Sequence, residues 1–274
     1  MKLDLIWYFD QAKEIWPNYR DGVRAAMEEL ERRGHTVRWH LGTDVKIEDD
    51  SDFILNWDNS TSQFIGEFHK YPNIRKGLIL TTELGLNIES LKNYDVVFAE
   101  SDYVASLIKP HGVRVITAFG TDTNFFSPHS IKTPKDYKAF YPSTFSPWKR
   151  QDVFADLYGD KGLCLGTIQP DGWDILRHTV EKGTNVYIGY LPVERVREFY
   201  RNCEMVHITG YEGSGRTVIE ALSMDMPVEA SPDNQKCQCY LAEFKASGMG
   251  AREFAIAYYS AQGYADSLMK GIDG

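Results

Sequence analysis

A glycine-rich turn between an apolar run and a helical run is the segment of this sequence with the clearest chemistry. Met205–Ile208 predicts a buried strand, and Val218–Met224 has the composition of a helix. Between them lies Gly210–Thr217, with the sequence GYEGSGRT. Such a turn directs several backbone N–H groups and the positive end of the helix dipole at one point. The turn therefore predicts a binding site for a phosphate group.

Two carboxylates frame this turn, with seven residues between them in the sequence. Glu212 lies in the turn, and Glu220 lies roughly one turn into the helix that follows. Carboxylates do not bind phosphate, but they accept hydrogen bonds from hydroxyl groups. Phosphate donors flanked by hydroxyl acceptors predict a ligand in which a sugar and a ribose flank the phosphates. That ligand is a nucleotide sugar.

The composition limits the class of protein that positions this turn. The chain has 274 residues, of which 43% are hydrophobic, so it can bury one large core or two domains of ordinary size. The net charge of −9 argues against a general nucleic-acid binder and against tight docking on anionic lipid. We expect no membrane-spanning segment and no signal peptide. The scattered cysteines predict reduced thiols in a cytoplasmic protein.

Metal-binding patterns are weak in this sequence. The Cys237-Gln238-Cys239 pair lacks two further ligands at zinc-finger spacing. Asp49-Asp50-Ser51-Asp52 offers the acidic pair that metal-dependent transferases use, but it precedes an expected strand and follows Glu48. That context favours a solvated acidic turn. We expect no metal site.

Strand-like and helix-like segments alternate along the chain, which predicts parallel sheets covered by helices. The strands expected in the first half are Leu3–Phe9, Thr36–Leu41, Asp52–Trp57, Gly77–Thr82, Asp95–Ala99 and Val113–Ala118. Those expected in the second half are Lys138–Ser143, Leu163–Gly166, Val186–Gly189, Glu204–Ile208 and Pro227–Ala230.

The junction between the two halves is predicted at residues 119–134, which contain Gly120, Pro128 and Pro134. We therefore expect an α/β fold with two Rossmann-like domains, residues 1–122 and 123–274. Ligands of such sheets bind beyond the carboxyl ends of the strands, where the glycine-rich turn falls. In the first domain, apolar residues recur at helical spacing between residues 23 and 30, and Gly34 is the expected end of that helix.

The glycine-rich turn and its surroundings resemble the donor-site signature of retaining glycosyltransferases of the GT-B fold, family 4 type. The residues that carry this resemblance are Glu212-Gly213-x-Gly215, Glu220-Ala221-Leu222 and Pro227-Val228. Weaker matches run along most of the chain in the same order. They are Leu30-x-x-x-Gly34-His35-x-Val37, Phe119-Gly120-x-Asp122-x-x-x-Phe126-x-Pro128, Val186-x-x-Gly189 and Val196-x-x-x-Tyr200-x-x-Cys203. The chain is a compact form, shorter than most members of that family.

The resemblance implies a fold and an activity. It implies two Rossmann-like domains whose parallel sheets face a central cleft, with the last helix, about 255–274, packed back on the N-terminal domain. It implies transfer of a hexose, with retention of configuration and without a metal, from a nucleotide-diphosphate sugar to a glycan or glycoconjugate hydroxyl. GDP-mannose is the favoured donor because mannosyl transfer is frequent among these enzymes, and UDP-sugars stay open.

The resemblance also implies roles for particular residues. Glu212 would bind hydroxyls of the transferred sugar, and Glu220 would bind the ribose. Lys149 would offset the charge that builds on the departing diphosphate. The expected catalytic residues are Glu212, Lys149 and Arg216. The expected donor-binding residues are Ser143, Lys149, Gly189, Tyr190, Leu191, Gly213, Ser214, Gly215, Arg216, Thr217 and Glu220.

The sequence departs from the family pattern at three places. The family usually carries an arginine where Ser143 stands here, and our hypothesis is that Arg216 supplies the missing phosphate clamp. The loop 10–21 lacks the paired glycines that commonly face the acceptor and the phosphate. Thr81-Thr82-Glu83 stands where a histidine is often found, which makes Glu83 a candidate contact of the sugar.

Two other functions fit parts of the sequence. Gly210-x-x-x-x-Gly215-Arg216-Thr217 is one substitution from the P-loop of nucleoside-triphosphate enzymes, with arginine where lysine is required. That interpretation leaves Glu212 and Glu220 without a role. A non-catalytic nucleotide-sugar-binding protein on the same scaffold is the other alternative.

The charge pattern bears on the partners. Arginines at positions 20, 24, 32 and 33 are offset by glutamates at 28, 29 and 31, so a strong lipid anchor is not expected. We expect a nucleotide-sugar donor, a glycan or glycoprotein acceptor, no nucleic acid and at most transient membrane contact. The sequence leaves homo-oligomer formation open.

Overall fold

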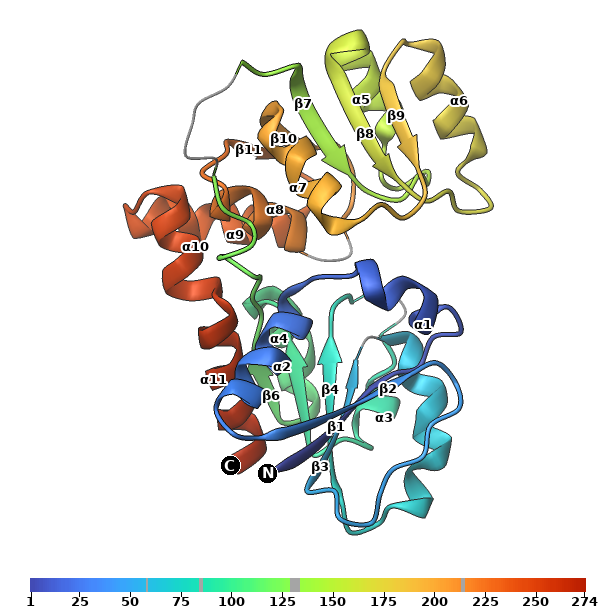
Figure 1. The fold of residues 1–274 in the computed structure, drawn as a ribbon, viewed down its shortest axis with the longest axis vertical. Helices are drawn as coiled ribbons and strands as arrows, with labels where there is room; N and C mark the ends of the chain where they lie inside the picture. The colour runs from blue at the N-terminus through green and yellow to red at the C-terminus, as the bar shows by residue number, and fades with distance from the viewer. Residues whose placement is uncertain (58, 84–85, 129–133, 213–214) are drawn as a thin grey trace. The chain divides into compact units, whose positions relative to one another are not determined.

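Two parallel β-sheets, each covered by helices, make up the described part of the chain (Figure 1). The computed structural model describes residues 1–57, 59–83, 86–128, 134–212 and 215–274, with residues 18 and 59–63 described by their backbone alone. The chain divides into two units. Unit 1 comprises Met1–Thr121 and Ser260–Gly274, and unit 2 comprises Asp122–Tyr259. The C-terminal helix thus belongs to the first unit.

Unit 1 contains a six-stranded sheet in the order β2-β1-β3-β4-β5-β6, and every neighbouring pair of strands is parallel. The strands are β1 (Lys2–Trp7), β2 (Thr36–Leu41), β3 (Phe53–Trp57), β4 (Arg75–Leu80), β5 (Val96–Ala99) and β6 (Val115–Thr117). The helical segments are α1 (Ala12–Ile15), η1 (Trp16–Asn18), α2 (Gly22–Arg32), η2 (Asn59–Lys70), α3 (Ile88–Leu91), α4 (Asp102–Ile108), η3 (Lys109–His111) and α11 (Ala261–Asp273).

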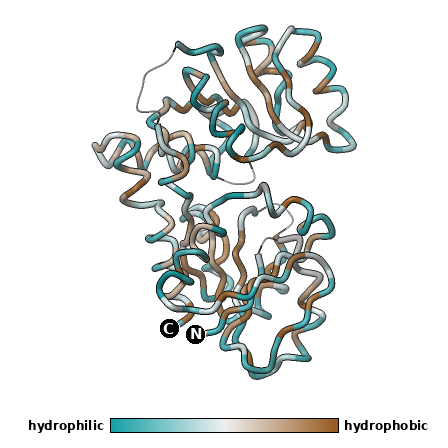
Figure 2. Tube along the Cα trace, viewed as in Figure 1, coloured by the Kyte–Doolittle hydropathy of each residue, from teal (hydrophilic) through white to brown (hydrophobic). Residues whose placement is uncertain are grey.

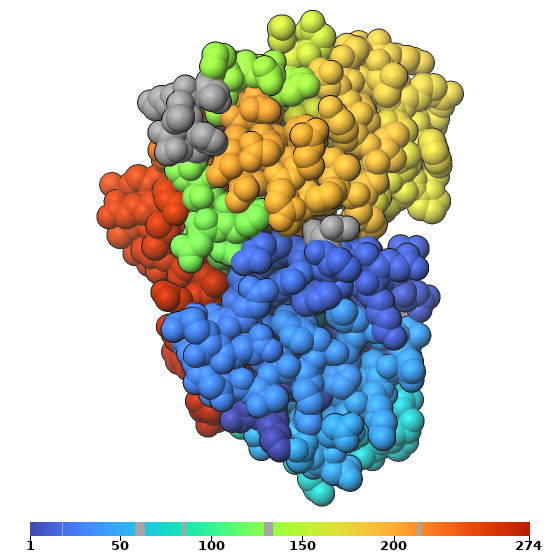
Figure 3. Space-filling model, viewed as in Figure 1, coloured from blue at the N-terminus to red at the C-terminus, as the bar shows by residue number. Residues whose placement is uncertain are grey.

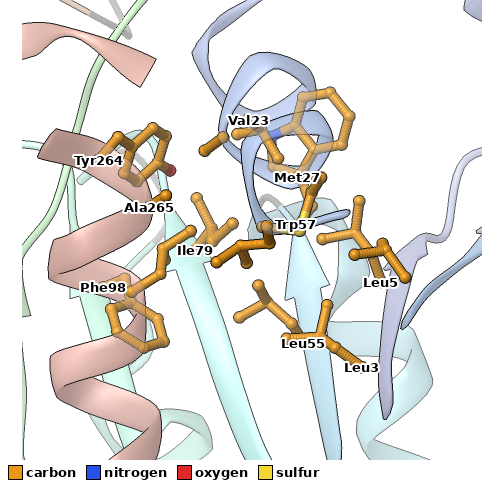
Figure 4. Close-up of a cluster of buried hydrophobic side chains, with 14 of the residues drawn as sticks. Leu3, Leu5, Val23, Met27, Leu55, Trp57, Ile79, Phe98, Tyr264 and Ala265 are labelled. Atoms are coloured by element: carbon orange, nitrogen blue, oxygen red, sulfur yellow. The ribbon is translucent and has the colours of Figure 1, made fainter. Parts of the chain in front are cut away.

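Each face of this sheet has its own hydrophobic core. One core joins β1, β3 and β5 to α2 and α11, and Figure 4 shows Met27, Phe98 and Tyr264 among the side chains of this cluster. The other core joins the opposite face to α4 and η2. Figure 2 shows apolar residues concentrated on the central strands of this unit. Strands buried on both faces explain why these segments are nearly continuous apolar runs in the sequence.

Unit 2 contains a five-stranded parallel sheet in the order β11-β10-β7-β8-β9. Its strands are β7 (Tyr137–Pro142), β8 (Gly162–Gly166), β9 (Asn185–Ile188), β10 (Cys203–Ile208) and β11 (Val228–Ala230). Its helical segments are α5 (Gln151–Tyr158), η4 (Gly159–Lys161), α6 (Trp173–Glu181), α7 (Val193–Arg201), α8 (Arg216–Ser223), α9 (Gln235–Ser247) and α10 (Ala251–Tyr259). The strand order reverses between β7 and β10.

The predicted α/β fold with two Rossmann-like domains is confirmed. Each of the eleven expected strands forms, with ends that differ by up to two residues from the expected ones. The first was expected at Leu3–Phe9 but ends at Trp7, because the chain turns there and the Phe9 N–H donates to the Trp7 carbonyl. Gly34 follows the end of α2 with φ +88°, a conformation that favours glycine, so the expected stop is also confirmed.

Glutamates of α2 pair with nearby arginines. Arg24 Nε lies 3.1 Å from Glu28, and Arg33 Nε lies 2.7 Å from Glu29.

The N-terminal segments, drawn in blue, make up most of the face of unit 1 that Figure 3 shows. Among the described residues, no helix is both long enough and apolar enough to cross a membrane.

Candidate functional site

The candidate site lies at the carboxyl ends of β7 and β10, where the strand order of unit 2 reverses. In open α/β sheets this is the position at which ligands bind, because the loops of the two strands lead to opposite faces and leave a crevice. The two loops are joined by hydrogen bonds. The Tyr211 N–H donates to the Trp148 carbonyl over 2.8 Å, and the Thr209 hydroxyl donates to the Arg150 carbonyl over 2.7 Å.

Gly210 makes this close approach of the loops possible. A Cβ atom at position 210 would lie 2.3 Å from the Lys149 carbonyl oxygen, a distance that real side chains do not tolerate. The Gly210 carbonyl in turn accepts a hydrogen bond from Asn234 Nδ2 over 3.1 Å. Asn234 also accepts from the Cys237 N–H as the N-cap of α9. The loops after β7, β10 and β11 therefore hold one another in place.

Lys149 and Glu212 form a buried ion pair across these loops. Lys149 Nζ lies 2.8 Å from Glu212 Oε2, and the two side chains are 11% and 9% exposed. The other carboxylate oxygen, Glu212 Oε1, is buried and accepts no hydrogen bond within the described ranges. Buried acceptors are normally satisfied, so an oxygen of this kind can accept a hydrogen bond from a ligand or a water molecule.

Tyr141 lies beneath this pair. Its hydroxyl donates to the Lys149 carbonyl over 2.9 Å and fixes the backbone of the lysine. Burial raises the pKa of the Tyr141 phenol well above its usual range, and the negative charge of Glu212 raises it further. Tyr141 is therefore a neutral hydrogen-bond donor at physiological pH.

Glu220 is held by residues of two helices. The Tyr200 hydroxyl of α7 donates to Glu220 Oε2 over 2.8 Å, and Arg216 Nε lies 3.5 Å from Glu220 Oε1. The Tyr200 ring is fully buried and meets Phe126 and Phe140 edge-on. Burial raises the pKa of Tyr200 well above its usual range, and the Glu220 charge adds to the effect. The hydrogen bond from Tyr200 orients the Glu220 carboxylate.

The start of α8 depends on Gly215. A Cβ atom at this position would lie 2.0 Å from the Tyr240 ring, so any side chain would push the helix away from α9. No described side chain caps α8 at its N-terminus. The first helical hydrogen bonds run from Val218 and Ile219 to the Gly215 carbonyl, so the amides of Arg216 and Thr217 precede them. Amides in that position point along the helix axis and suit an anion.

The structure brings some of the predicted site residues together. Lys149 meets Glu212, and Arg216 meets Glu220. The Arg216 side chain, which is 40% exposed, thus contacts the Glu220 carboxylate through its guanidinium group. Gly213 and Ser214 lie outside the described residues.

Of the remaining predicted residues, Ser143 lies at the start of the loop that carries Lys149, and the others lie on other loops. Ser143 follows β7, and its carbonyl accepts from Gln151 Nε2 over 3.2 Å. Gly189, Tyr190 and Leu191 follow β9, two strands from β7 in the sheet; Gly189 has φ +105°, and Tyr190 is 59% exposed. Glu83 belongs to unit 1, where it follows β4.

Several residues of the site are absent from the predicted site residues, among them Tyr240, Asn234 and Tyr200. The Tyr240 ring leaves no room for a side chain at Gly215. Asn234 donates to the loop after β10, and the Tyr200 hydroxyl donates to Glu220. Asn234 could have been found, because asparagine before a helical run is a typical N-cap. Tyr200 lies in one of the family matches, but its partner lies 20 residues away and on another helix.

The acidic turn before β3 is occupied by structural ion pairs. Asp50 pairs with Lys2 and with Arg38, and Arg38 reaches the buried Asp4 over 2.8 Å. Within the described ranges, no group of three or more histidine, cysteine or acidic side chains could hold a metal ion.

Comparison with known proteins shows the fold. No protein-family model matches the sequence, and no curated protein matches it either. Among solved structures, sucrose-phosphate synthase from Thermosynechococcus elongatus is similar with a TM-score of 0.68 at 13% identity, over 98% of this chain and 97% of that one. AviGT4, a glycosyltransferase involved in avilamycin A biosynthesis, has a TM-score of 0.63 at 13% identity, over 99% of this chain and 97% of that one.

A third similar structure is an α-glucosyltransferase in complex with UDP and a 13-mer DNA that contains an HMU base. Its TM-score is 0.65 at 11% identity, and the likeness covers 100% of both chains. At such low identity these likenesses concern the fold alone. The chain has two Rossmann-like units of the type found in GT-B glycosyltransferases.

Proposed function

We propose that the protein is a glycosyltransferase that moves a hexose from a nucleoside-diphosphate sugar to a hydroxyl of a glycan or glycoconjugate. The observation that carries the proposal is the buried Glu212 carboxylate at the strand reversal of unit 2, with one oxygen on Lys149 and the other without a described partner. A hydroxyl of a sugar is the neutral donor that such an oxygen accepts from. The similar fold of a transferase solved with UDP supports a nucleoside diphosphate as the carrier.

The proposed donor lies across the two loops and the start of α8. Its pyrophosphate lies at the amides that begin α8 and near the Lys149 ammonium group, both of which attract negative charge. The transferred sugar donates a hydroxyl to Glu212. The ribose donates hydroxyls to Glu220, whose carboxylate Tyr200 orients.

The proposed reaction retains the configuration of the sugar and needs no metal ion. The bond between the anomeric carbon and the phosphate oxygen breaks, and the diphosphate leaves with the electron pair. Lys149 and the α8 amides offset the charge that develops on the leaving oxygen. The acceptor hydroxyl forms the new bond on the same face of the sugar and passes its proton to the departing phosphate.

The proposal extends to the identity of the nucleotide base and of the sugar in the donor. The family resemblance favours GDP-mannose, and the fold shared with a UDP-bound glucosyltransferase supports UDP-glucose. Both donors present the same pyrophosphate and ribose hydroxyls to Lys149 and Glu220, so this part of the site does not choose between them. A panel of donors decides it.

Calorimetry in buffer with EDTA tests the proposal. UDP-glucose, GDP-mannose and ATP are titrated into the protein, and we expect one nucleotide sugar to bind while ATP does not. Binding of ATP that requires Mg²⁺, without binding of either sugar donor, would instead support a nucleoside-triphosphate enzyme.

Turnover separates a transferase from a non-catalytic binding protein. We expect slow release of the free nucleoside diphosphate from the bound donor in the presence of EDTA, and faster release with a glycan acceptor. The anomeric configuration of the product, measured by NMR, tests retention. A donor that binds and stays intact under every condition would leave only a binding function.

A further inference from the structure

Each cation of the candidate site is matched with one of its acids. Lys149 is paired with Glu212, and Arg216 with Glu220. The Lys149–Glu212 pair is the stronger of the two, because both side chains are buried and the ammonium and carboxylate groups are 2.8 Å apart. Arg216 is more exposed and lies farther from its acid, so solvent screens that pair.

The Lys149–Glu212 ion pair opposes the binding of a simple anion at this site. A phosphate group that attracts the Lys149 ammonium competes with Glu212 for it. If the ammonium moves, the Glu212 carboxylate keeps its charge in a buried position and loses the cation that balances it. An isolated buried charge is far more costly than a paired one. An anion alone therefore gains little from this site.

A nucleotide sugar provides a new partner for both the Lys149 ammonium group and the Glu212 carboxylate. Its pyrophosphate takes the ammonium of Lys149, and a sugar hydroxyl donates to the Glu212 carboxylate that the ammonium leaves. Glu212 Oε1, which has no described partner, is a second place for a hydroxyl. The cost of separating the ion pair is then offset by hydrogen bonds that free phosphate or pyrophosphate cannot make.

We propose that the Lys149–Glu212 ion pair is a specificity device that admits pyrophosphate only when it carries a sugar. The inference rests on the proposed function and adds to it the reason why the site rejects free polyphosphates. Glu212 acts here in two ways. Its ion pair competes with a bare anion for the Lys149 ammonium group. Its carboxylate also accepts hydrogen bonds from a ligand that carries hydroxyl groups.

The test uses inorganic pyrophosphate as the probe, measured by calorimetry in buffer without metal. Glu212→Gln removes the negative charge and keeps the size of the side chain. We expect this variant to bind pyrophosphate about tenfold more tightly than the wild-type protein, which corresponds to about 1.4 kcal/mol. We expect the preference for the nucleotide sugar over pyrophosphate to shrink by at least the same factor.

A matched control removes the effect of overall charge. Glu204 pairs with Lys138 on the surface of the same sheet, with both side chains about half exposed. Glu204→Gln changes the net charge of the protein by the same amount, and we expect its affinity for pyrophosphate to stay at the wild-type value. An equal gain in both variants would overturn the proposal, because the effect would then be a general one.

A second variant tests whether the gain passes through Lys149. In Glu212→Gln with Lys149→Met, both buried charges are removed together, and we expect the added affinity for pyrophosphate to disappear. Thermal unfolding of each variant confirms that the fold is kept. A gain that persists without the lysine would also overturn the proposal.

The outcomes distinguish the inference from the proposed function. If the wild-type protein binds a nucleotide sugar and Glu212→Gln gains no affinity for pyrophosphate, the specificity device is wrong and the function stands. If no nucleotide sugar binds but the variant gains affinity for pyrophosphate, the ion pair controls an anion site and the function is wrong. If neither occurs, both are wrong.

Discussion

The two units place different chemistry at the same topological position. In unit 1 the strand order reverses between β1 and β3, and there Trp7 and Trp57 pack together with ring centres 4.6 Å apart. In unit 2 the order reverses between β7 and β10, and there Lys149 pairs with Glu212. One crevice position is filled by packed aromatic rings, and the other by buried charges.

The aromatic cluster of unit 1 extends into the loop after β1. Trp16 of η1 packs against Trp39 of β2 with ring centres 4.4 Å apart and the rings tilted by 49°. Arg24 of α2 donates to the carbonyls of Trp16 and Tyr19 and lies over the Trp16 ring at 4.6 Å. The loop that lacks the family's paired glycines is thus built as packed helical turns. The contrast teaches that one strand topology can serve packing in one unit and polar binding in the other.

Removal of an aromatic ring from unit 1 should have the largest effect on stability. Trp57 is 3% exposed, so Trp57→Ala leaves a cavity, and we expect it to cost about 3–5 kcal/mol in free energy of unfolding. Urea unfolding followed by circular dichroism measures it. Trp173→Ala removes a ring that is 61% exposed and should stay within about 0.5 kcal/mol of the wild-type value. Equal effects of the two changes would mean that the cluster contributes no packing.

Removal of the lysine from unit 2 should act on catalysis. With Lys149→Met, the charge on the leaving diphosphate is no longer offset, and we expect kcat for sugar transfer to fall by about 10²–10³-fold. The buried Glu212 also loses its partner, so stability should fall and should recover when Glu212→Gln is added. Lys138→Met removes an exposed lysine from the start of β7 and serves as the control. Normal turnover in Lys149→Met would remove the lysine from the mechanism.

Gly215→Ala tests the approach of α8 to α9. The added methyl group would overlap the Tyr240 ring, so we expect a loss of about 1–3 kcal/mol in stability and weaker donor binding as the helix start shifts. At Gly250 a Cβ atom meets nothing within 4 Å, so Gly250→Ala is the matched control. Thermal unfolding and calorimetry compare the two. The contact with Tyr240 is of no consequence if both variants behave alike.

Tyr200→Phe tests whether a side chain that touches no ligand in the proposed mechanism acts through Glu220. Loss of the hydroxyl frees the carboxylate to rotate, and we expect the affinity for the nucleoside diphosphate to fall about fivefold, or about 1 kcal/mol. A 2′,3′-dideoxy nucleoside diphosphate has no ribose hydroxyls and should show no difference between the variant and the wild-type protein. Equal losses for both ligands would make the role of Tyr200 purely structural.

The smallest effect concerns alkaline pH. The pKa of Tyr200 is raised in the folded protein by burial and by Glu220, while the unfolded chain has a tyrosine pKa of about 10. The stabilisation from neutral Tyr200 is therefore complete below about pH 10 and is lost as the pH rises above it. Tyr200→Phe should lose less stability than the wild-type protein over that range, measured by urea unfolding. Identical curves would contradict the assignment.

Much of the fold follows from local sequence. The central strands could be predicted because they are short apolar runs between turn residues, as expected for strands of a parallel sheet that are buried on both faces. The edge strands β2, β9 and β11 are partly exposed, and their place in the alternation of strands and helices predicted them. The turn Gly210–Thr217 could be found because its glycines and acids are close together in the chain. Lys149 was included through the family resemblance alone, since a lysine beside an arginine has no distinctive pattern of its own.

The sequence by itself determined the α/β class, the position of the strands and the turn that begins α8, because these depend on residues near one another in the chain. Only the tertiary structure decided which charges meet. Lys149 and Glu212 are 63 residues apart in sequence, and they pair because β7 and β10 are neighbours in the sheet. The same holds for Trp7 and Trp57, which are in contact because β1 and β3 lie side by side. Hydrophobic periodicity predicts a strand but not its neighbour, and the neighbour determines the chemistry of the site.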